Sequence, residues 1–381
     1  MREIALVAAR RHAVATQGFA PRKRRASMGE MVACIERLGC VQIDSISVVD
    51  RSQRLVLAAR CGRLPAGAHD ALLRSRRVFE YWAHEACLLP VRDEPYFRHD
   101  KRVHGRYHRW FGPILEEHKE LAAEVLAVAR ERGEIASRDF GGAGSGYWEW
   151  TPAKRVLDAL WTSGQLAIAG RKGVERMYAL PERVFPDEIL GLPDPTVEET
   201  HRWQVESAVR ARGIAGELRL SDYWRVRGKR KTIAPAIEHL VSEGVLERLR
   251  VPELDEVWLV SAEDADRAIA GDANPTGAFL LSPFDNVLWD RIEAEKLFGF
   301  EHRLEIYKRP PERIYGYYVL PLIDGAEIVG RIDLKSDRKA GTLRALAVHW
   351  QGRPRPRALR EALARLVHVL GLERSEINGG V

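Results

Sequence analysis

The sequence predicts an α+β protein made of three tandem winged helix-turn-helix modules and a C-terminal antiparallel β-barrel with a closing helix. Three observations predict this class. Two stretches in the middle of the chain repeat each other, the N-terminal region fits the same template more loosely, and the last third is strand-like before one amphipathic helix. The composition, 45% hydrophobic and 30% charged over 381 residues, is typical of a globular protein of several modules.

The repeat relates residues 151–180 to residues 231–260 at a constant offset of 80. Each copy predicts a helix that ends at a glycine, a short polar segment, a second amphipathic helix and two strands. In the first copy the helix over 121–132 ends at Gly133, and the second helix opens with Thr151 as N-cap and Pro152 at the first helical position. This order of elements is typical of a winged helix, whose third helix commonly enters the DNA major groove.

The N-terminal region aligns with the first copy at an offset of 125. A helix is expected over residues 31–39, followed by a first wing strand over residues 40–44, CVQID. Alternation places Val41 and Ile43 toward the core, and Gln42 and Asp44 together on the opposite face. The other two copies carry unrelated residues at those two positions, so the fold alone does not require an amide beside a carboxylate.

The last third predicts the barrel and its closing helix, after a Gly- and Pro-containing linker at 271–277. The expected strands are 279–289, 298–308, 313–323, 326–336 and 341–350, and the expected helix is 358–372. The predicted domains are 1–110, with the polar pair and a basic extension, then 111–193, 194–270 and 271–381.

The charge pattern favours DNA as the partner. The net charge is +6, and basic clusters lie at 21–25, 98–110 and 227–231. The second cluster also interleaves Tyr107 and Trp110 with its cations, a mixture that suits phosphates and bases.

Other classes of site find less support. Cys34, Cys40, Cys61 and Cys87 form neither a CxxC pair nor a zinc-like cluster, so a reduced protein without metal or cofactor is expected. No apolar run approaches the roughly 20 residues that span a bilayer. The charged N-terminus is expected to be the first helix of a cytoplasmic protein, without contact to a membrane.

Two non-catalytic alternatives remain open on these patterns. Three winged helices are common in transcription regulators, and a DNA-binding protein without sequence preference would also fit. In either case Gln42 and Asp44 are surface residues with no joint task, and His84 is a core histidine.

Six segments resemble the AlkZ/YcaQ family of bacterial winged-helix DNA glycosylases: VQIDSISVVDR, EYWAHEACLLP, LLSPFDNVLWDR, LFGFEHRLEIY, YGYYVLPLIDG and VGRIDLKSDR. The resemblance implies three winged helices and a barrel around double-stranded DNA. The family signature is Gln, an aliphatic residue, then Gln or Asp, and Gln42-Ile43-Asp44 matches the Asp-bearing branch. That branch is expected to remove N7-alkylguanines and to unhook nitrogen-mustard interstrand crosslinks. Ser52, Gln53 and Arg54 depart from the histidines that often follow.

The predicted chemistry is hydrolysis of an N-glycosidic bond. An N7-alkylated purine is cationic and leaves as a neutral base, so no general acid is needed. Asp44 would stabilise the oxocarbenium-like sugar and activate a water, and it is expected to be ionised without an upward pKa shift. Gln42 would orient the water or sugar. No lysine stands beside the motif to form a Schiff base, so an abasic-site product without lyase activity is expected.

Further side chains are candidates for DNA contact, and three modules in one polypeptide predict a monomer. The candidates are Arg51, Arg54, His84, Glu85, Arg102, Arg106, Tyr107, Arg109, Arg171, Lys172, Lys229, Arg230 and Lys231.

Overall fold

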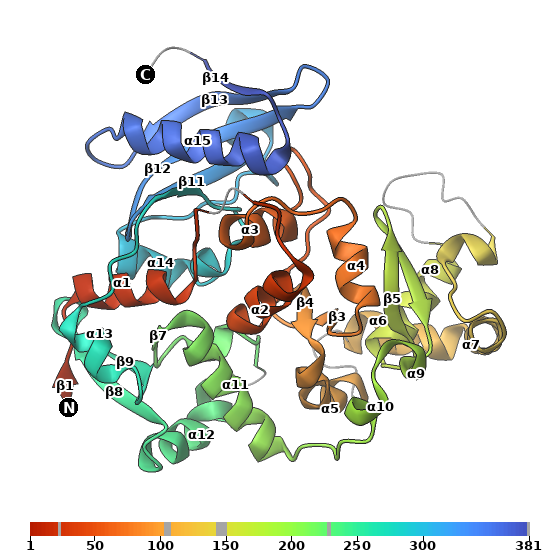
Figure 1. The fold of residues 1–381 in the computed structure, drawn as a ribbon. Coiled ribbons are helices and arrows are strands. Elements are labelled where there is room, and N and C mark those ends of the chain that lie inside the picture. The colour runs from red at the N-terminus through yellow and green to blue at the C-terminus, as the bar shows by residue number, and fades with distance from the viewer. Residues whose placement is uncertain (22–23, 103–107, 142–150, 227–229, 379–381) are drawn as a thin grey trace. The chain divides into compact units, whose positions relative to one another are not determined.

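The computed structural model describes residues 1–21, 24–102, 108–141, 151–226 and 230–378, and its fold is α+β (Figure 1). The chain forms two compact units. The first unit comprises residues 1–65 and 201–381, and the second comprises residues 66–200. In the described parts of the chain, no helix is both long and apolar enough to cross a bilayer.

The first unit is built from two sheets and the helices around them. Its helices are α1 (Leu6–Thr16), α2 (Met28–Leu38), α3 (Ser52–Cys61), most of α11 (Val197–Arg212), α12 (Arg230–Ser242), α13 (Ala265–Ala270), α14 (Arg291–Phe298) and α15 (Pro356–Leu370). Its strands are β1 (Arg2–Glu3), β2 (Val41–Gln42), β7 (Ile214–Gly216), β8 (Leu246–Val251), β9 (Glu256–Ser261), β10 (Ala278–Leu280), β11 (Val319–Asp324), β12 (Glu327–Asp337), β13 (Thr342–Trp350) and β14 (Arg374–Ile377).

The second unit contains the first copy of the repeat and a hairpin of its own. Its helices are α4 (Ala68–Arg74), α5 (Arg98–Arg102), α6 (His108–Glu117), α7 (Lys119–Arg132), α8 (Pro152–Thr162), α9 (Pro181–Val184) and α10 (Asp187–Leu190). The antiparallel pairs are β3 (Val78–Trp82) with β4 (Ala86–Pro90), and β5 (Ala167–Lys172) with β6 (Glu175–Ala179).

The two repeats share an order of elements. Helix α7, a 3₁₀ turn at Ser137–Phe140, helix α8 and the β5–β6 hairpin form the first. Helix α11, strand β7, a 3₁₀ turn at Leu220–Asp222, helix α12 and the β8–β9 hairpin form the second, in which β7 pairs with β9. In both copies the second helix is followed by a glycine with positive φ, 77° at Gly164 and 71° at Gly244, a conformation that glycine adopts without strain.

Helix α2 begins with a capping box formed by Ser27 and Glu30. The Ser27 hydroxyl accepts a hydrogen bond from the backbone N–H of Glu30, and the Glu30 carboxylate accepts one from the backbone N–H of Ser27. This capping box satisfies two N–H groups that the helix itself cannot bond. Met31, Val32 and Ile35 are buried on one face, as the N-terminal alignment predicted.

The predicted first wing is wrong. Strand β2 ends at Gln42, residues 43–51 form no strand, and helix α3 then begins at Ser52. Alternation over five residues is too short to hold an extended conformation against the helix signal that follows. Gln42 and Asp44 therefore do not share the outer face of a strand.

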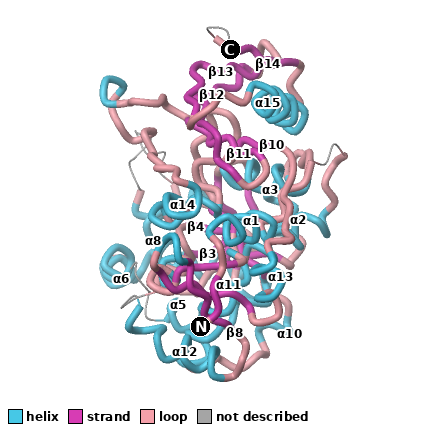
Figure 2. The backbone as a smooth tube through the Cα atoms, turned by 90° about the vertical axis from the view of Figure 1, so that its left-hand side faces the viewer, coloured by secondary structure: helices cyan, strands magenta, loops and turns pink. Residues whose placement is uncertain are grey.

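The C-terminal sheet has the order β10-β11-β12-β13-β14, with α15 packed beside it (Figure 2). Leu359, Leu363 and Leu366 of α15 are buried in the core that this sheet forms, which confirms the predicted apolar face. Within the described residues, edge strands β10 and β14 do not pair, so the sheet curls as a half-barrel. The predicted antiparallel barrel is therefore present only as a half-barrel sheet, and its β13–β14 pair is parallel.

Two predicted strands are also corrected. Residues 299–309 contain no strand, and the predicted strand at 313–323 begins only at Val319. Pro310 and Pro311 lack the N–H groups that a ladder needs, and Gly316 has a φ of 137°, so the segment forms a loop around a 3₁₀ turn. The strand expected over 279–289 stops at Leu280 for a 3₁₀ turn at Asn286–Leu288.

Candidate active site

The Gln42-Ile43-Asp44 motif lies in the first unit, where β2 ends and the loop toward α3 begins. Gln42 is 7% exposed, and Asp44 is partly buried. The motif is therefore a half-enclosed site and not the open strand face that alternation predicted.

Two hydrogen bonds fix Asp44. Its Oδ1 accepts from the backbone N–H of Ile46 at 2.8 Å, and its own backbone N–H donates to Oε1 of Gln53 at 3.3 Å. Gln53 lies in the first turn of α3 and is 2% exposed. Among the described residues, no group donates to Oδ2 of Asp44, so this oxygen is the one that can act on a water.

Burial raises the pKa of Asp44 above its usual value, and the hydrogen bond from Ile46 partly opposes that rise. The expectation that Asp44 needs no upward shift is therefore wrong. A carboxylate with a raised pKa is a stronger base when ionised, which suits the activation of a water near neutral pH.

The raised pKa predicts that Asp44→Asn stabilises the fold at neutral pH. The folded state holds a proton on Asp44 more tightly than the unfolded state does. The contribution of protonated Asp44 to the free energy of unfolding is therefore complete below the unfolded pKa of about 4, and it is lost as pH rises through the folded pKa. Asparagine keeps an oxygen for Ile46 and carries no charge. Urea unfolding of both proteins should show an advantage for Asp44→Asn at pH 7 that vanishes near about pH 4. An equal advantage at both pH values would contradict this cause.

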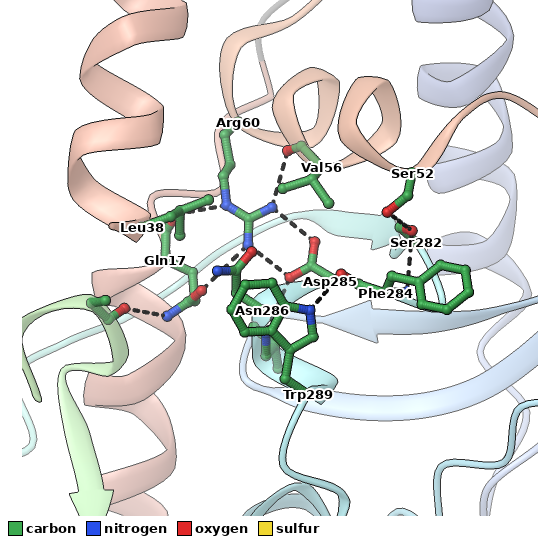
Figure 3. A network of polar contacts seen from close by, with 12 residues as sticks. Gln17, Leu38, Ser52, Val56, Arg60, Ser282, Phe284, Asp285, Asn286 and Trp289 are labelled. Atoms are coloured by element: carbon green, nitrogen blue, oxygen red, sulfur yellow. Dashed lines mark hydrogen bonds and ion pairs between the residues drawn. The ribbon is translucent and has the colours of Figure 1, made fainter. Parts of the chain in front are cut away.

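The segment Ser282–Asn286 takes part in a network of polar contacts with α3 and with the chain just before the motif; Figure 3 shows much of this network. The side-chain amide of Asn286 donates to the backbone oxygen of Cys40, two residues before Gln42, and to the hydroxyl of Tyr223, both at 2.9 Å. The hydroxyls of Ser282 and Ser52 lie 3.0 Å apart, which joins this segment to the first residue of α3. The SPFDN segment thus acts as a support for the site.

A buried ion pair lies in the same support. Both guanidinium Nη atoms of Arg60 lie 2.8 Å from the carboxylate oxygens of Asp285. Arg60 also donates to the backbone oxygens of Gln17 at 2.9 Å and Val56 at 3.0 Å. The pair, shown in Figure 3, joins α3, which follows the motif in the chain, to the segment whose Asn286 bonds Cys40 before it.

Tyr318 lies beside the loop that carries Asp44. Its hydroxyl donates to the backbone oxygen of Asp50 at 3.4 Å. Burial raises the pKa of Tyr318, and the negative charges of Asp44 and Asp50 raise it further. Tyr318 is therefore a neutral phenol at the edge of the site. Sequence reasoning missed Gln53, Asn286 and Tyr318 as site residues, although the last two lie within segments that carry the family resemblance.

The predicted DNA contacts of the first unit have mixed environments. Arg51 is partly buried as the residue before α3, and Arg54 pairs with Asp50 at 2.9 Å. Arg230 pairs with Glu217 at 3.3 Å with its side chain half exposed, and Lys231 is exposed. Lys229 lies outside the described residues.

In the second unit, His84 is buried, and Glu85 lies at the tip of the β3–β4 hairpin. Arg102 is exposed and paired with Asp194, and Lys172 is exposed at the end of β5. Arg106 and Tyr107, and the side chain of Arg109, lie outside the described residues.

The side chain of Arg171, a predicted DNA contact, is instead largely buried in ion pairs. Its Nε donates to Glu80 at 2.8 Å, and Arg176 donates to the same carboxylate at 2.9 Å and to Asp158 at 2.9 Å. Although burial raises the pKa of Glu80, the charges of Arg171 and Arg176 hold it well below its usual value. Arg171 thus neutralises an internal carboxylate within the second unit.

Comparison with known proteins concerns the fold of the whole chain. The structure is similar to the Streptomyces sahachiroi DNA glycosylase AlkZ, with a TM-score of 0.69 at 17% identity, over 98% of this chain and 100% of that one. The fold is therefore one that a DNA glycosylase adopts.

The family follows from the sequence match. Residues 35–369 match the family described as AlkZ-like DNA glycosylases. The chain belongs to this AlkZ-like family, so it is an enzyme of DNA repair that acts on DNA.

Proposed function

We propose that the chain is a monofunctional DNA glycosylase that hydrolyses the N-glycosidic bond of N7-alkylated, cationic purines. Interstrand crosslinks of the nitrogen-mustard type are a second substrate in this proposal, because each linked purine carries the same positive charge. The product is an abasic site. The observation that carries the proposal is Asp44: a partly buried carboxylate with a raised pKa, held through Oδ1, in the Gln-x-Asp motif.

The chemistry requires little more than this carboxylate. As the cationic base departs it becomes neutral, and positive charge develops on the sugar. Ionised Asp44 stabilises that charge and takes a proton from a water through Oδ2, and the water attacks C1′. The Gln42 amide can donate to the sugar or water and accept from the other, which keeps the water in line.

The proposed DNA-binding surface consists of the helix–hairpin repeats and of exposed cations. We infer that the two repeats are winged helices, with a looser N-terminal relative, and that the chain acts as a monomer on double-stranded DNA in the cytoplasm. The exposed cations Lys172, Arg102, Arg230 and Lys231 are the proposed phosphate contacts among the predicted residues. Such contacts suit an enzyme that must bind any sequence, and they predict strong salt dependence.

The direct test uses duplex DNA with one N7-methylguanine, and a second duplex with a mustard crosslink. Released base is measured by chromatography, and abasic sites are measured by strand cleavage in alkali. We expect free N7-methylguanine and alkali-dependent breaks, and conversion of the crosslinked duplex to separable strands. A regulator or an inactive DNA-binding protein would bind these duplexes and release nothing, which would contradict the proposal.

Lack of lyase activity is a separate prediction. The chain has no lysine between Lys23 and Lys101, so no side-chain amine adjoins the motif in sequence. We expect that borohydride added during the reaction traps no covalent protein–DNA adduct, since no imine forms. A glycosylase known to form an imine serves as the positive control. A trapped adduct would show that an amine, and not water, attacks C1′.

A further inference from the structure

The peptide that carries Asp44 is tied to helix α3 by a single side chain. The backbone N–H of Asp44 donates to Oε1 of Gln53 at 3.3 Å. A backbone N–H can only donate, so the carboxamide must present its oxygen at this point. The bond from Ile46 to Oδ1 of Asp44 lies within the loop and would turn with it. The bond to Gln53 therefore fixes the Asp44 peptide relative to the rest of the first unit.

Gln53 itself has little freedom to move. It is 2% exposed and lies in the first turn of α3. Both of its neighbours in the chain are anchored, because the Ser52 hydroxyl lies 3.0 Å from that of Ser282 and Arg54 pairs with Asp50 at 2.9 Å. A buried side chain between two anchored residues keeps one conformation, so its oxygen stays where the Asp44 peptide needs it.

A chain of buried hydroxyl groups joins the start of α3 to the far end of the loop. Ser52, Ser282 and Tyr318 are each 1% exposed or less. The Ser282 oxygen accepts from the backbone N–H of Phe284 at 3.2 Å, and its hydroxyl is hydrogen-bonded to Tyr318. The Tyr318 hydroxyl in turn donates to the backbone oxygen of Asp50 at 3.4 Å. The loop from Asp44 to Asp50 is therefore held to this network at both ends.

The charges around the loop leave Asp44 without a counter-ion. Tyr318, just before β11, interacts electrostatically with Asp44, and its raised pKa keeps it neutral. Other charged groups on the elements around the loop are paired with one another: Asp50 with Arg54 of α3 and Arg338 of β12, and Asp285 with Arg60 of α3. The acceptor for the Asp44 N–H is also neutral, because it is a carboxamide. A carboxylate in its place would accept the same bond but would oppose the ionisation of Asp44.

We propose that Gln53 is a positioning residue for excision, which holds the Asp44 peptide so that Oδ2 of Asp44 faces the attacking water. This inference rests on the proposed function, because it names what aims the carboxylate of that site. Gln53 acts through Asp44 and needs no contact with the sugar or the base. A displacement of about 1 Å in a reacting group can cost about 10²-fold in rate, so one bond to the backbone has a measurable effect.

Three variants test this role by excision of N7-methylguanine under single-turnover conditions. Gln53→Leu removes the acceptor. Gln351→Leu is the matched control, since it removes an amide that donates to the backbone oxygen of Gly299 at 3.0 Å in the same unit. We expect Gln53→Leu to lower the maximal rate by about 10-fold to 10²-fold and to change the half-saturating enzyme concentration by about 2-fold or less. Gln351→Leu should match the wild type.

The third variant, Gln53→Glu, separates positioning from a general loss of structure. It keeps an acceptor for the Asp44 N–H but places a second carboxyl group beside Asp44. Since the two carboxyl groups then compete for one proton, the rising limb of the pH–rate profile should move to higher pH by about half a unit or more. The plateau above that limb should return to within about 3-fold of the wild type. Equal losses in Gln53→Leu and Gln53→Glu at every pH, with the limb unmoved, would show a merely structural role and overturn the proposal.

Hydrogen exchange of the Asp44 amide provides a readout that does not need catalysis. We expect Gln53→Leu to speed this exchange by about 10-fold or more, because the N–H loses its acceptor, and Gln351→Leu to leave it unchanged. Unchanged exchange in Gln53→Leu, or faster exchange with a normal excision rate, would overturn the proposal. If the wild type released no base, the proposed function would fail, whereas the exchange rate would still show whether Gln53 holds Asp44.

Discussion

Asp44→Asn is expected to lower single-turnover excision of N7-methylguanine by about 10³-fold or more, because it removes both the charge that stabilises the sugar cation and the base that activates water. Asparagine retains the acceptor that Ile46 uses at 2.8 Å, so the loop should keep its shape. Rates are measured with enzyme in excess over duplex, and binding is measured by fluorescence anisotropy.

Gln42→Ala is the comparison variant for this substitution, because it changes the other polar residue of the motif. It leaves the carboxylate in place and removes only the orienting amide, so a loss of about 10²-fold is expected. Affinity for undamaged duplex should change little in either variant, because phosphate contacts dominate it. Excision by Asp44→Asn within about 10-fold of wild type would remove Asp44 from the chemistry.

Breaking the Arg60–Asp285 pair is expected to have the largest effect on stability. The side chains are 2% and 0% exposed, so Arg60→Met or Asp285→Leu alone leaves one charge buried without its partner. The free energy of unfolding should fall by about 3–5 kcal/mol in each single variant, measured by urea denaturation of the full chain. Burial of a paired charge is weak evidence for stability, whereas loss of one partner is costly.

Two further variants test whether an unpaired buried charge causes the loss of stability. The double variant Arg60→Met/Asp285→Leu should be more stable than either single variant, because no buried charge remains. Arg355→Met breaks a half-exposed pair with Asp324 in the same unit and should cost about 1 kcal/mol or less. Single variants at Arg60 and Asp285 that cost no more than Arg355→Met would show that the buried pair does not support the site.

Local signals predicted much of the fold. The apolar face of α15, the N-cap and proline that begin α8, and the glycines after α8 and α12 each act over a few residues, so they could be read directly from the chain. The offset of 80 between copies likewise aligned two helix–hairpin units from residue spacing alone.

Where strands end and pair could not be predicted from such local signals, because it depends on long-range contacts and on the backbone. Strand β2 stops at Gln42 and the half-barrel stays open, because partners distant in sequence decide where strands pair and end. The segment expected as a strand at 298–308 precedes Pro310 and Pro311, and it serves as a loop.

The Gln42-Ile43-Asp44 motif was proposed as the active site from resemblance, and its surroundings in the fold were not predicted. The backbone N–H of Asp44 donates a hydrogen bond to Gln53, nine residues later in the chain. The side chain of Asn286 donates one to the backbone oxygen of Cys40, 246 residues earlier. Such contacts have no periodic signature. The raised pKa of Asp44 results from burial, so the expectation of an unshifted carboxylate could only be corrected by the folded structure.

The pH dependence of single-turnover excision of N7-methylguanine by the wild type most directly tests the role of Asp44. One ionised carboxylate with no general acid predicts a rate that rises tenfold per pH unit, levels off above the raised pKa of Asp44, and stays level to about pH 8. The residual rate of Asp44→Asn should lack the rising limb. A bell-shaped profile, or the same rising limb in Asp44→Asn, would show that another group carries the chemistry.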